Sequence, residues 1–183
     1  QILSRFGVRV PKQILSHRPN DYKELIELVD GLPTVGKLQR GSLGDGVFLL
    51  NDTLAASTSL RSFEQTGADV ILQGFINTGE VKNDIRIIVI GAETKNPKTY
   101  AYKRFALADD FRSNYTKSKL GEKVEITDEE KDMAIRASKL LKMGVCGVDL
   151  MRDSKDKNIP YMIECNGSPG LLGIEKVTEE NVA

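Results

Sequence analysis

The sequence predicts an α+β fold with mixed and antiparallel sheets. Segments with apolar residues at helical spacing stand between strand-like segments, and several strand-like segments follow one another directly as hairpins. Helices and strands do not alternate regularly, as they would in a doubly wound parallel sheet. The 183 residues suffice for one domain, or for one domain made of two lobes, with a sizeable core.

The first 76 residues are expected to contain helices that precede or connect short strands. Asn20 and Asp21 start one helix, which a Gly-Leu-Pro sequence ends, and Asp52 or Thr53 caps the next. The last strand of this part, "ADVILQGFI", is expected to be buried because its apolar content is continuous. The expected helices are residues 1–6, 20–30 and 52–67, and the expected extended segments are residues 8–16, 34–39, 46–50 and 68–76.

The remaining residues are expected to form two hairpins and one long helix. Residues 83–106 read as a hairpin with its turn at "GAETKNPK", and residues 107–123 as a long polar loop of the kind that is usually functional. Thr127 and Glu130 have the spacing of a capping box at the start of a helix that ends before Gly144. "VCGVDLMR" and "IPYMIECN" form a last pair of strands joined by "DSKDKN".

Composition narrows the function. The 26 basic and 26 acidic side chains balance, which argues against nucleic acid as a partner. Cys146 and Cys165 lie in apolar strand-like segments without CxxC spacing, and His17 is the one histidine, so a zinc site is not expected. The two cysteines are instead expected to be reduced thiols in a cytoplasmic protein. No apolar segment approaches the roughly 20 residues of a membrane span, and no signal-peptide pattern is present.

Three oxygen-bearing side chains stand on the last pair of strands. Glu164 and Asn166 project to one side because alternate strand residues share a face, and Asp149 lies on the strand expected to pair with them. Facing side chains approach to about 5 Å across an antiparallel pair. Oxygen ligands with few carboxylates suit Mg²⁺, which shares its coordination shell with substrate phosphates. The alternative is an ordinary hairpin whose polar residues face solvent.

A glycine-rich loop lies between two strands of the first half. Gly41, Gly44 and Gly46 permit close approach of backbone N–H groups to an anion, and Lys37 stands four residues upstream. The spacing is neither that of a Walker loop nor that of a Rossmann or kinase loop. The loop therefore reads as a phosphate cover between strands, with Lys37 either turned toward a phosphate or extended to solvent.

Charged and polar residues on the central hairpin and the loop after it, taken with the glycine-rich loop and the oxygen ligands, are the kinds of residue that phosphoryl transfer needs. Such transfer needs charge neutralisation and positioning rather than a protein nucleophile. Asp84 and Arg86 share a strand face, so an ion pair between these two residues is an alternative explanation for them. The residues of this group are Asp84, Arg86, Arg104, Arg112, Ser113 and Asn114.

The segments "DIR", "FRSN", "GVDLMR" and "IECNGSPGLLGIEK" occur in an order that resembles the ATP-grasp ligases, and within them the RimK-like glutamate ligases that modify ribosomal protein S6. The resemblance covers nearly the whole chain. It implies two α+β lobes that clamp a nucleotide, with residues from about 1 to 75 in a smaller lobe and from about 76 to 183 in a larger one. The N-terminal domain that precedes this fold in relatives is expected to be absent.

The resemblance also implies roles for individual residues. Asp149, Glu164 and Asn166 match the family's ligands for Mg²⁺ or Mn²⁺. Arg86, Arg104 and Arg112 are implied to hold the substrate carboxylate and the oxyanion during catalysis. The residues implied to bind ATP are Lys37, Gly41, Ser42, Gly44, Gly46, Gln73, Gly74, Phe75, Asp84, Arg112, Ser113 and Asn114.

The implied activity is that of an ATP-dependent carboxylate–amine ligase that acts through an acyl phosphate. The added amino acid is glutamate by family default, and the acceptor is a peptide, a protein or a small molecule; no membrane or nucleic-acid partner is implied. Relatives assemble as homo-oligomers, commonly tetramers. Two alternatives stay open: an ATP-grasp phosphotransferase, and a nucleotide-binding module without catalytic activity.

Overall fold

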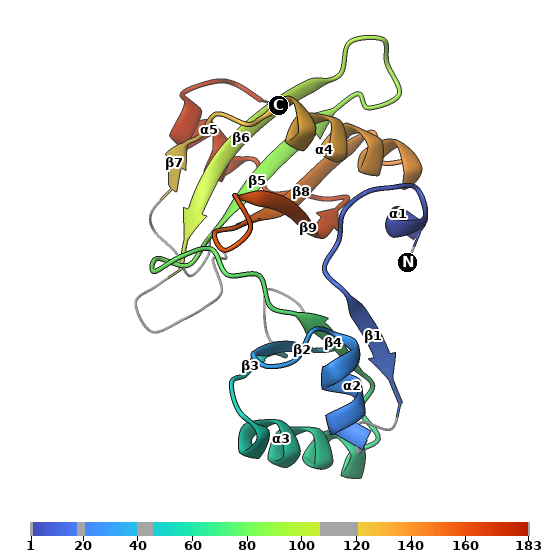
Figure 1. Cartoon of the computed structure of the whole chain (residues 1–183). Coiled ribbons are helices and arrows are strands. Elements are labelled where there is room, and N and C mark those ends of the chain that lie inside the picture. Colours follow the sequence, from blue (N-terminus) through green and yellow to red (C-terminus); the bar gives the residue numbers. More distant parts are fainter. Residues whose placement is uncertain (1, 18–20, 40–45, 107–120, 183) are drawn as a thin grey trace. The chain divides into compact units, whose positions relative to one another are not determined.

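The structure is a computed structural model of the chain, and it describes residues 2–17, 21–39, 46–106 and 121–182. It contains two compact units, each with its own antiparallel sheet (Figure 1). One unit is Pro11–Ile76, and the other is Asn77–Ala183 together with Gln1–Val10. Within the described residues, no helix is long and apolar enough to cross a membrane.

The unit Pro11–Ile76 has a four-stranded sheet in the order β1-β4-β2-β3, here called the small sheet. Two helices accompany it, and the core lies between helix residues such as Leu60 and strand residues such as Leu72. Asp52 caps the second helix, since its side chain accepts a hydrogen bond of 2.8 Å from the Ala55 N–H. The elements are β1 Gln13–Ser16, α2 Tyr22–Leu28, β2 Thr34–Leu38, β3 Val47–Leu50, α3 Thr53–Gln65 and β4 Val70–Gly74.

The second unit has a five-stranded sheet in the order β7-β6-β5-β8-β9, here called the large sheet. Helix α4 packs along one of its faces, and the predicted capping box of Thr127 and Glu130 opens that helix (Figure 1). The elements are α1 Ile2–Arg5, β5 Asn83–Ile90, β6 Lys98–Phe105, β7 Gly121–Lys123, α4 Asp128–Leu140, β8 Val145–Asp153, β9 Ile159–Asn166 and α5 Leu172–Thr178.

The two faces of the large sheet differ in chemistry because strand residues alternate. Ile85, Ile87 and Val89 of β5 belong to the apolar core that includes residues of α4. Asp84 and Arg86, which flank Ile85 along the strand, point to the opposite face. On that face, apolar packing continues toward α5, where Ile88 clusters with residues of that helix.

The fold class is confirmed, and the main helices and strands lie close to their expected positions. Two short elements, β7 and α5, were not expected as separate elements, because three and seven residues carry too little periodicity to be recognised. The structure also groups residues 1–10 with the larger unit rather than the smaller. Val8 is buried in the core of the large sheet, and the Met162 N–H donates to the Arg9 carbonyl oxygen at 2.9 Å.

Candidate functional site

Four charged side chains form a buried network on the face of the large sheet opposite α4. Arg86 donates from Nε and Nη2 to the two carboxylate oxygens of Asp149, each at 2.7 Å. Arg104 makes the same bidentate contact with Asp84, with Nε 2.6 Å from Oδ1. Arg104 Nη2 also lies 2.9 Å from Asp149 Oδ2, so one guanidinium joins both carboxylates.

Strand register explains why these residues meet. Asp84 lies opposite Arg104 across β5 and β6, and Arg86 lies opposite Asp149 across β5 and β8. The alternative that Asp84 and Arg86 pair with each other is wrong, because each is paired across the sheet instead. The Arg104 side chain is 1% exposed and that of Arg86 13%, so Arg86 lies nearer to solvent.

The network keeps its members charged despite burial. Burial alone disfavours the charged form of Asp149, but attraction to Arg104 and Arg86 outweighs it and lowers the pKa of this carboxyl. Burial likewise opposes the charge on Arg104, and the carboxylates of Asp149 and Asp84 overcome it and raise the pKa of the guanidinium. A buried, ionised cluster of this kind presents fixed charges to any ligand on this face.

The structure places two of the predicted metal ligands directly opposite each other. Asp149 pairs with Glu164 across β8 and β9, and Asn166 lies opposite Gly147 on the same pair of strands. A β-bulge makes this possible: Leu150 pairs with Met162, so one extra residue lies on β9 before Glu164. Without the bulge, Glu164 would share a face with Met162, whose side chain lies in the core beneath α4.

The donor set of these three residues fits a hard divalent cation. A carboxylate has about four acceptor positions, and the guanidinium contacts of Asp149 use three of them. Asn166 Oδ1 accepts one hydrogen bond, from the Ser168 N–H at 2.8 Å, and Glu164 is exposed. Each ligand therefore keeps an oxygen lone pair of the type that Mg²⁺ or Mn²⁺ binds. Among the described residues, no three Cys, His, Asp and Glu side chains group as an alternative metal site.

The predicted nucleotide residues of the smaller unit lie on its sheet. Lys37 is half-buried on β2, opposite Val47, and Gly46 has a φ of +81° just before β3. Gln73 and Gly74 end β4, and the Gly74 N–H donates to the Lys12 carbonyl oxygen at 2.9 Å. The phosphate-cover hypothesis for the loop after β2 stays a prediction, because residues 40–45 lie outside the described residues.

Gly74 occupies a position with little room for a side chain. A Cβ there would lie 3.0 Å from the Val29 carbonyl oxygen, which belongs to the backbone and cannot move aside cheaply. Phe75 follows directly after the strand. The other predicted residues, namely Gly41, Ser42, Gly44, Arg112, Ser113 and Asn114, lie outside the described residues.

Sequence reasoning missed Tyr102 as a member of this site. It lies opposite Arg86 on β6 and is 1% exposed, and burial raises the pKa of its phenol while Arg104 and Arg86 oppose the shift. Its spacing of two from Arg104 on the same strand was the signal that could have placed it on this face.

Comparison with known proteins shows what this arrangement is similar to. The family model described as the RimK-like ATP-grasp domain matches residues 1–183. A probable alpha-L-glutamate ligase of Hydrogenovibrio crunogenus is 38% identical over the whole chain, which spans 58% of that relative. The ribosomal protein bS6–L-glutamate ligase of Salmonella paratyphi B is also 38% identical, with the same two coverages. The chain thus spans less than two thirds of the length of these relatives.

Solved structures show the same fold at lower identity. The ATP-grasp ligase PsnB, complexed with a phosphomimetic variant of its minimal precursor, Mg and ADP, aligns with a TM-score of 0.73 and 20% identity, covering 99% of this chain and 52% of PsnB. The N5-carboxyaminoimidazole synthetase from Staphylococcus aureus, complexed with ADP, aligns with a TM-score of 0.69 and 17% identity, covering 92% of this chain and 43% of the other. Both likenesses concern the fold.

Proposed function

Because this chain belongs to the RimK-like ATP-grasp family, we propose that it is the nucleotide-binding part of an ATP- and Mg²⁺-dependent carboxylate–amine ligase. The amino acid added is glutamate and the acceptor is a peptide or protein, in keeping with the relatives named as glutamate ligases. The observation that carries this assignment is the convergence of Asp84, Arg86, Arg104 and Asp149 on one sheet face, with Glu164 in register beside them.

The reaction has two balanced steps. A carboxylate oxygen of one substrate attacks the γ-phosphorus of ATP, and the bond to the oxygen that bridges the β- and γ-phosphates breaks, giving an acyl phosphate and ADP. The amine nitrogen of the second substrate then attacks the acyl carbon. An amide bond forms, inorganic phosphate leaves, and the amine loses a proton. Both steps develop negative charge on oxygen, which fixed cations stabilise.

The arginines differ in burial and in free N–H donors, and this difference suggests different roles in catalysis. Arg104 has its guanidinium buried between Asp84 and Asp149, so we assign it the positioning of these carboxylates. Arg86 uses two of its five N–H donors on Asp149 and is more exposed, which leaves donors for substrate oxygens. Arg112 is the second candidate for that contact, as the family resemblance implies.

Asp149, Glu164 and Asn166 would hold the metal ion in this scheme. Bound Mg²⁺ would supply positive charge that offsets the charge of the ATP phosphates. The protein's part is to keep the Asp149 carboxylate ionised and oriented, which its two guanidinium partners achieve. The β-bulge before Glu164 turns the second carboxylate to the same face.

Calorimetric titration of Mg–ADP tests this function on the chain itself. We expect saturable binding to the parent chain and binding weakened at least tenfold when Glu164→Ala and Asn166→Ala are combined, since charge-assisted metal contacts are lost. The matched control combines Glu93→Ala and Asn96→Ala, an exposed pair in the turn between β5 and β6. This control is expected to bind like the parent.

Two outcomes would contradict the assignment. Equal affinity in the Glu164/Asn166 variant and the control would show that these residues do not hold the metal. Binding of Mg–ADP without any glutamate-dependent release of phosphate from ATP, in the protein that carries this chain together with an acceptor peptide, would favour a nucleotide-binding module. Phosphorylated product without amide would favour a phosphotransferase.

A further inference from the structure

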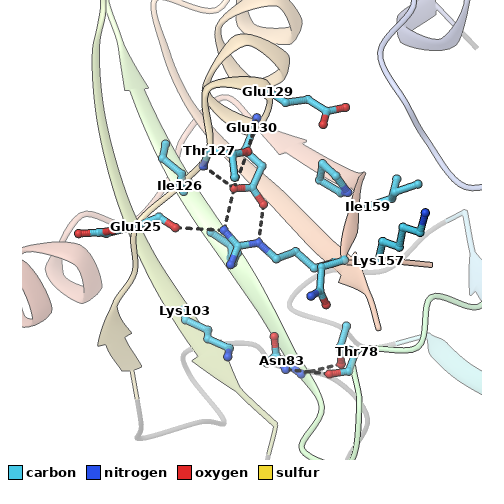
Figure 2. A pocket seen from close by; sticks show the side chains of 14 residues that line it. Thr78, Asn83, Lys103, Glu125, Ile126, Thr127, Glu129, Glu130, Lys157 and Ile159 are labelled. Carbon is cyan, nitrogen blue, oxygen red and sulfur yellow. Dashed lines mark hydrogen bonds and ion pairs between the residues drawn. The ribbon is translucent and has the colours of Figure 1, made fainter. Parts of the chain in front are cut away.

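The α4 face of the large sheet carries two features of different chemistry, at opposite ends of β8 and β9. A cavity lies where β8 ends and β9 begins, and there Arg152 donates to both carboxylate oxygens of Glu130, at 2.6 and 2.7 Å, so these charges are satisfied within the protein (Figure 2). Where β8 begins and β9 ends lie Cys146 and Cys165, the two cysteines of the chain. The proposed ligase mechanism uses neither thiol.

Strand register places the two thiols on the same face of the sheet. Val148 pairs with Cys165, and Cys146 precedes Val148 by two residues, so the cysteines are diagonal neighbours on adjacent strands. Both pack in the apolar core beneath α4. The largest influence on the pKa of each thiol is a hydrogen bond to the other, which lowers the pKa of Cys146 to about 7 and raises that of Cys165. The two sulfur atoms are therefore in contact.

Contact and unequal exposure distinguish this pair from cysteines that only fill space in a core. A buried cysteine by itself behaves as a small apolar side chain. Here both cysteines are free thiols, and Cys146 is 0% exposed whereas Cys165 is partly exposed. A dissolved reagent can thus reach Cys165, and the second thiol lies beside it, shielded from solvent.

We propose that Cys146 and Cys165 are a site of reversible oxidation, at which a low-molecular-weight disulfide converts the two thiols into an intramolecular disulfide. In the first step the Cys165 thiolate attacks one sulfur of the reagent, a mixed disulfide forms, and one reagent thiol leaves. The Cys146 thiolate then attacks the Cys165 sulfur, and the second reagent thiol leaves. The protein gives up two protons and two electrons, which reduce the reagent R–S–S–R to two R–SH.

The new bond is expected to move the end of β9. An S–S bond is about 2 Å long, whereas the unbonded contact between Cys165 Sγ and Met162 Sδ is 3.5 Å, so bond formation draws the cysteine sulfur atoms together by more than an ångström. The strand that shifts is β9, because it is the last strand in the order of the large sheet.

This movement reaches the proposed metal ligands. Glu164 and Asn166 flank Cys165 along the chain, and the Asn166 N–H donates a hydrogen bond to the Cys146 sulfur. If these two residues hold Mg²⁺, which rests on the proposed function, oxidation of the thiols weakens Mg–ADP binding. The disulfide itself does not depend on that function.

Equilibration of the chain with mixtures of oxidised and reduced glutathione tests the site. The remaining thiols are alkylated, and the intact mass is measured. Because the chain contains two cysteines, the intramolecular disulfide is the product that lacks two hydrogen atoms and takes up neither an alkyl group nor glutathione. We expect it to exceed the mixed disulfides at least tenfold in the folded chain. The ratio should fall at least tenfold in urea, where the strands no longer hold the thiols together.

Two variants separate the roles of the thiols. Cys146→Ala leaves the partly exposed Cys165, which should stop at the mixed disulfide with glutathione. Cys165→Ala leaves Cys146, which is 0% exposed and should react at least tenfold more slowly. Alanine keeps a small apolar side chain at each position, and amide hydrogen exchange of β8 checks that both variants are folded.

The results for the parent chain decide the proposal even where a variant does not fold. An intramolecular disulfide that predominates and depends on the fold supports it. Mixed disulfides without an intramolecular bond, disulfide-linked dimers, or the same product ratio with and without urea would overturn it.

Titration of Mg–ADP into the reduced and the oxidised chain tests the link to the metal ligands. We expect the affinity to fall at least threefold on oxidation and to recover when the disulfide is reduced with dithiothreitol. Equal affinity in the two states would overturn this link. Failure of the reduced chain to bind Mg–ADP would instead refute the proposed nucleotide site, while the disulfide measured by mass would stand.

Discussion

Replacing Arg104 with methionine is expected to destabilise the large sheet strongly. The side chain is 1% exposed, and its guanidinium joins Asp84 and Asp149. Removing one partner from a buried ion pair costs about 3–5 kcal/mol, because the remaining charge stays buried without that partner. This is about a third of the stability of a typical domain, so the unit should remain folded while its strands open far more often.

Hydrogen exchange of the β5 amides measures this loss within the unit that contains it. Every 1.4 kcal/mol is a factor of ten, so the slowest β5 amides should exchange about a hundredfold to several thousandfold faster in Arg104→Met. The control is Lys103→Met, the neighbouring β6 residue, which faces the other side of the sheet and is 29% exposed. Its effect should stay below about 1 kcal/mol, as is usual for a partly exposed charge.

A second substitution tests whether buried charge is the cause. Adding Asp84→Asn to Arg104→Met removes the carboxylate that lost its two-pronged contact, so the double variant should lose less stability than the two single variants added together. β5 exchange in Arg104→Met that matches Lys103→Met would refute the reasoning. Strict additivity in the double variant would show that the Asp84–Arg104 pair is not coupled.

Two further changes probe other parts of the molecule. Burial opposes the charge on Glu130, but Arg152 outweighs it and lowers the pKa of this carboxyl, so its contribution exists above the unfolded value of about 4.3 and is lost as pH falls through the folded pKa. Glu130→Gln should therefore cost about 2 kcal/mol in urea unfolding at pH 7, and the cost should shrink as pH falls below the unfolded value and disappear only below the lowered folded pKa; a cost independent of pH would contradict this. Gly36→Ala places a Cβ 2.1 Å from the Phe48 ring and should destabilise the small sheet by about 1–3 kcal/mol, while unchanged β4 exchange would count against that packing.

The sequence alone was enough to predict the type and order of most elements. Helix α4 was predictable because its apolar stripe and its Thr127–Glu130 cap lie within one local segment. Its end was predicted at Gly144, whereas the left-handed residue that follows the helix is Lys142, with a φ of +55°. The strands were also predictable from local sequence, because their period of two shows which residues share a face. The period of two did not decide the grouping of Asp149 with Glu164, because only the β-bulge between Leu150 and Asp149 sets the two residues opposite each other.

Only the tertiary structure decided which charged residues pair. Asp84 and Arg86 share a face and offered a local pair, but the register of β5 sets Asp84 against Arg104 and Arg86 against Asp149. The burial of Arg104 could not be predicted from the sequence either, because whether its guanidinium contacts solvent or two carboxylates depends on strands that are distant in sequence. Local spacing determines the direction of a side chain, whereas its partner and its exposure depend on inter-strand register and packing, which no local pattern encodes.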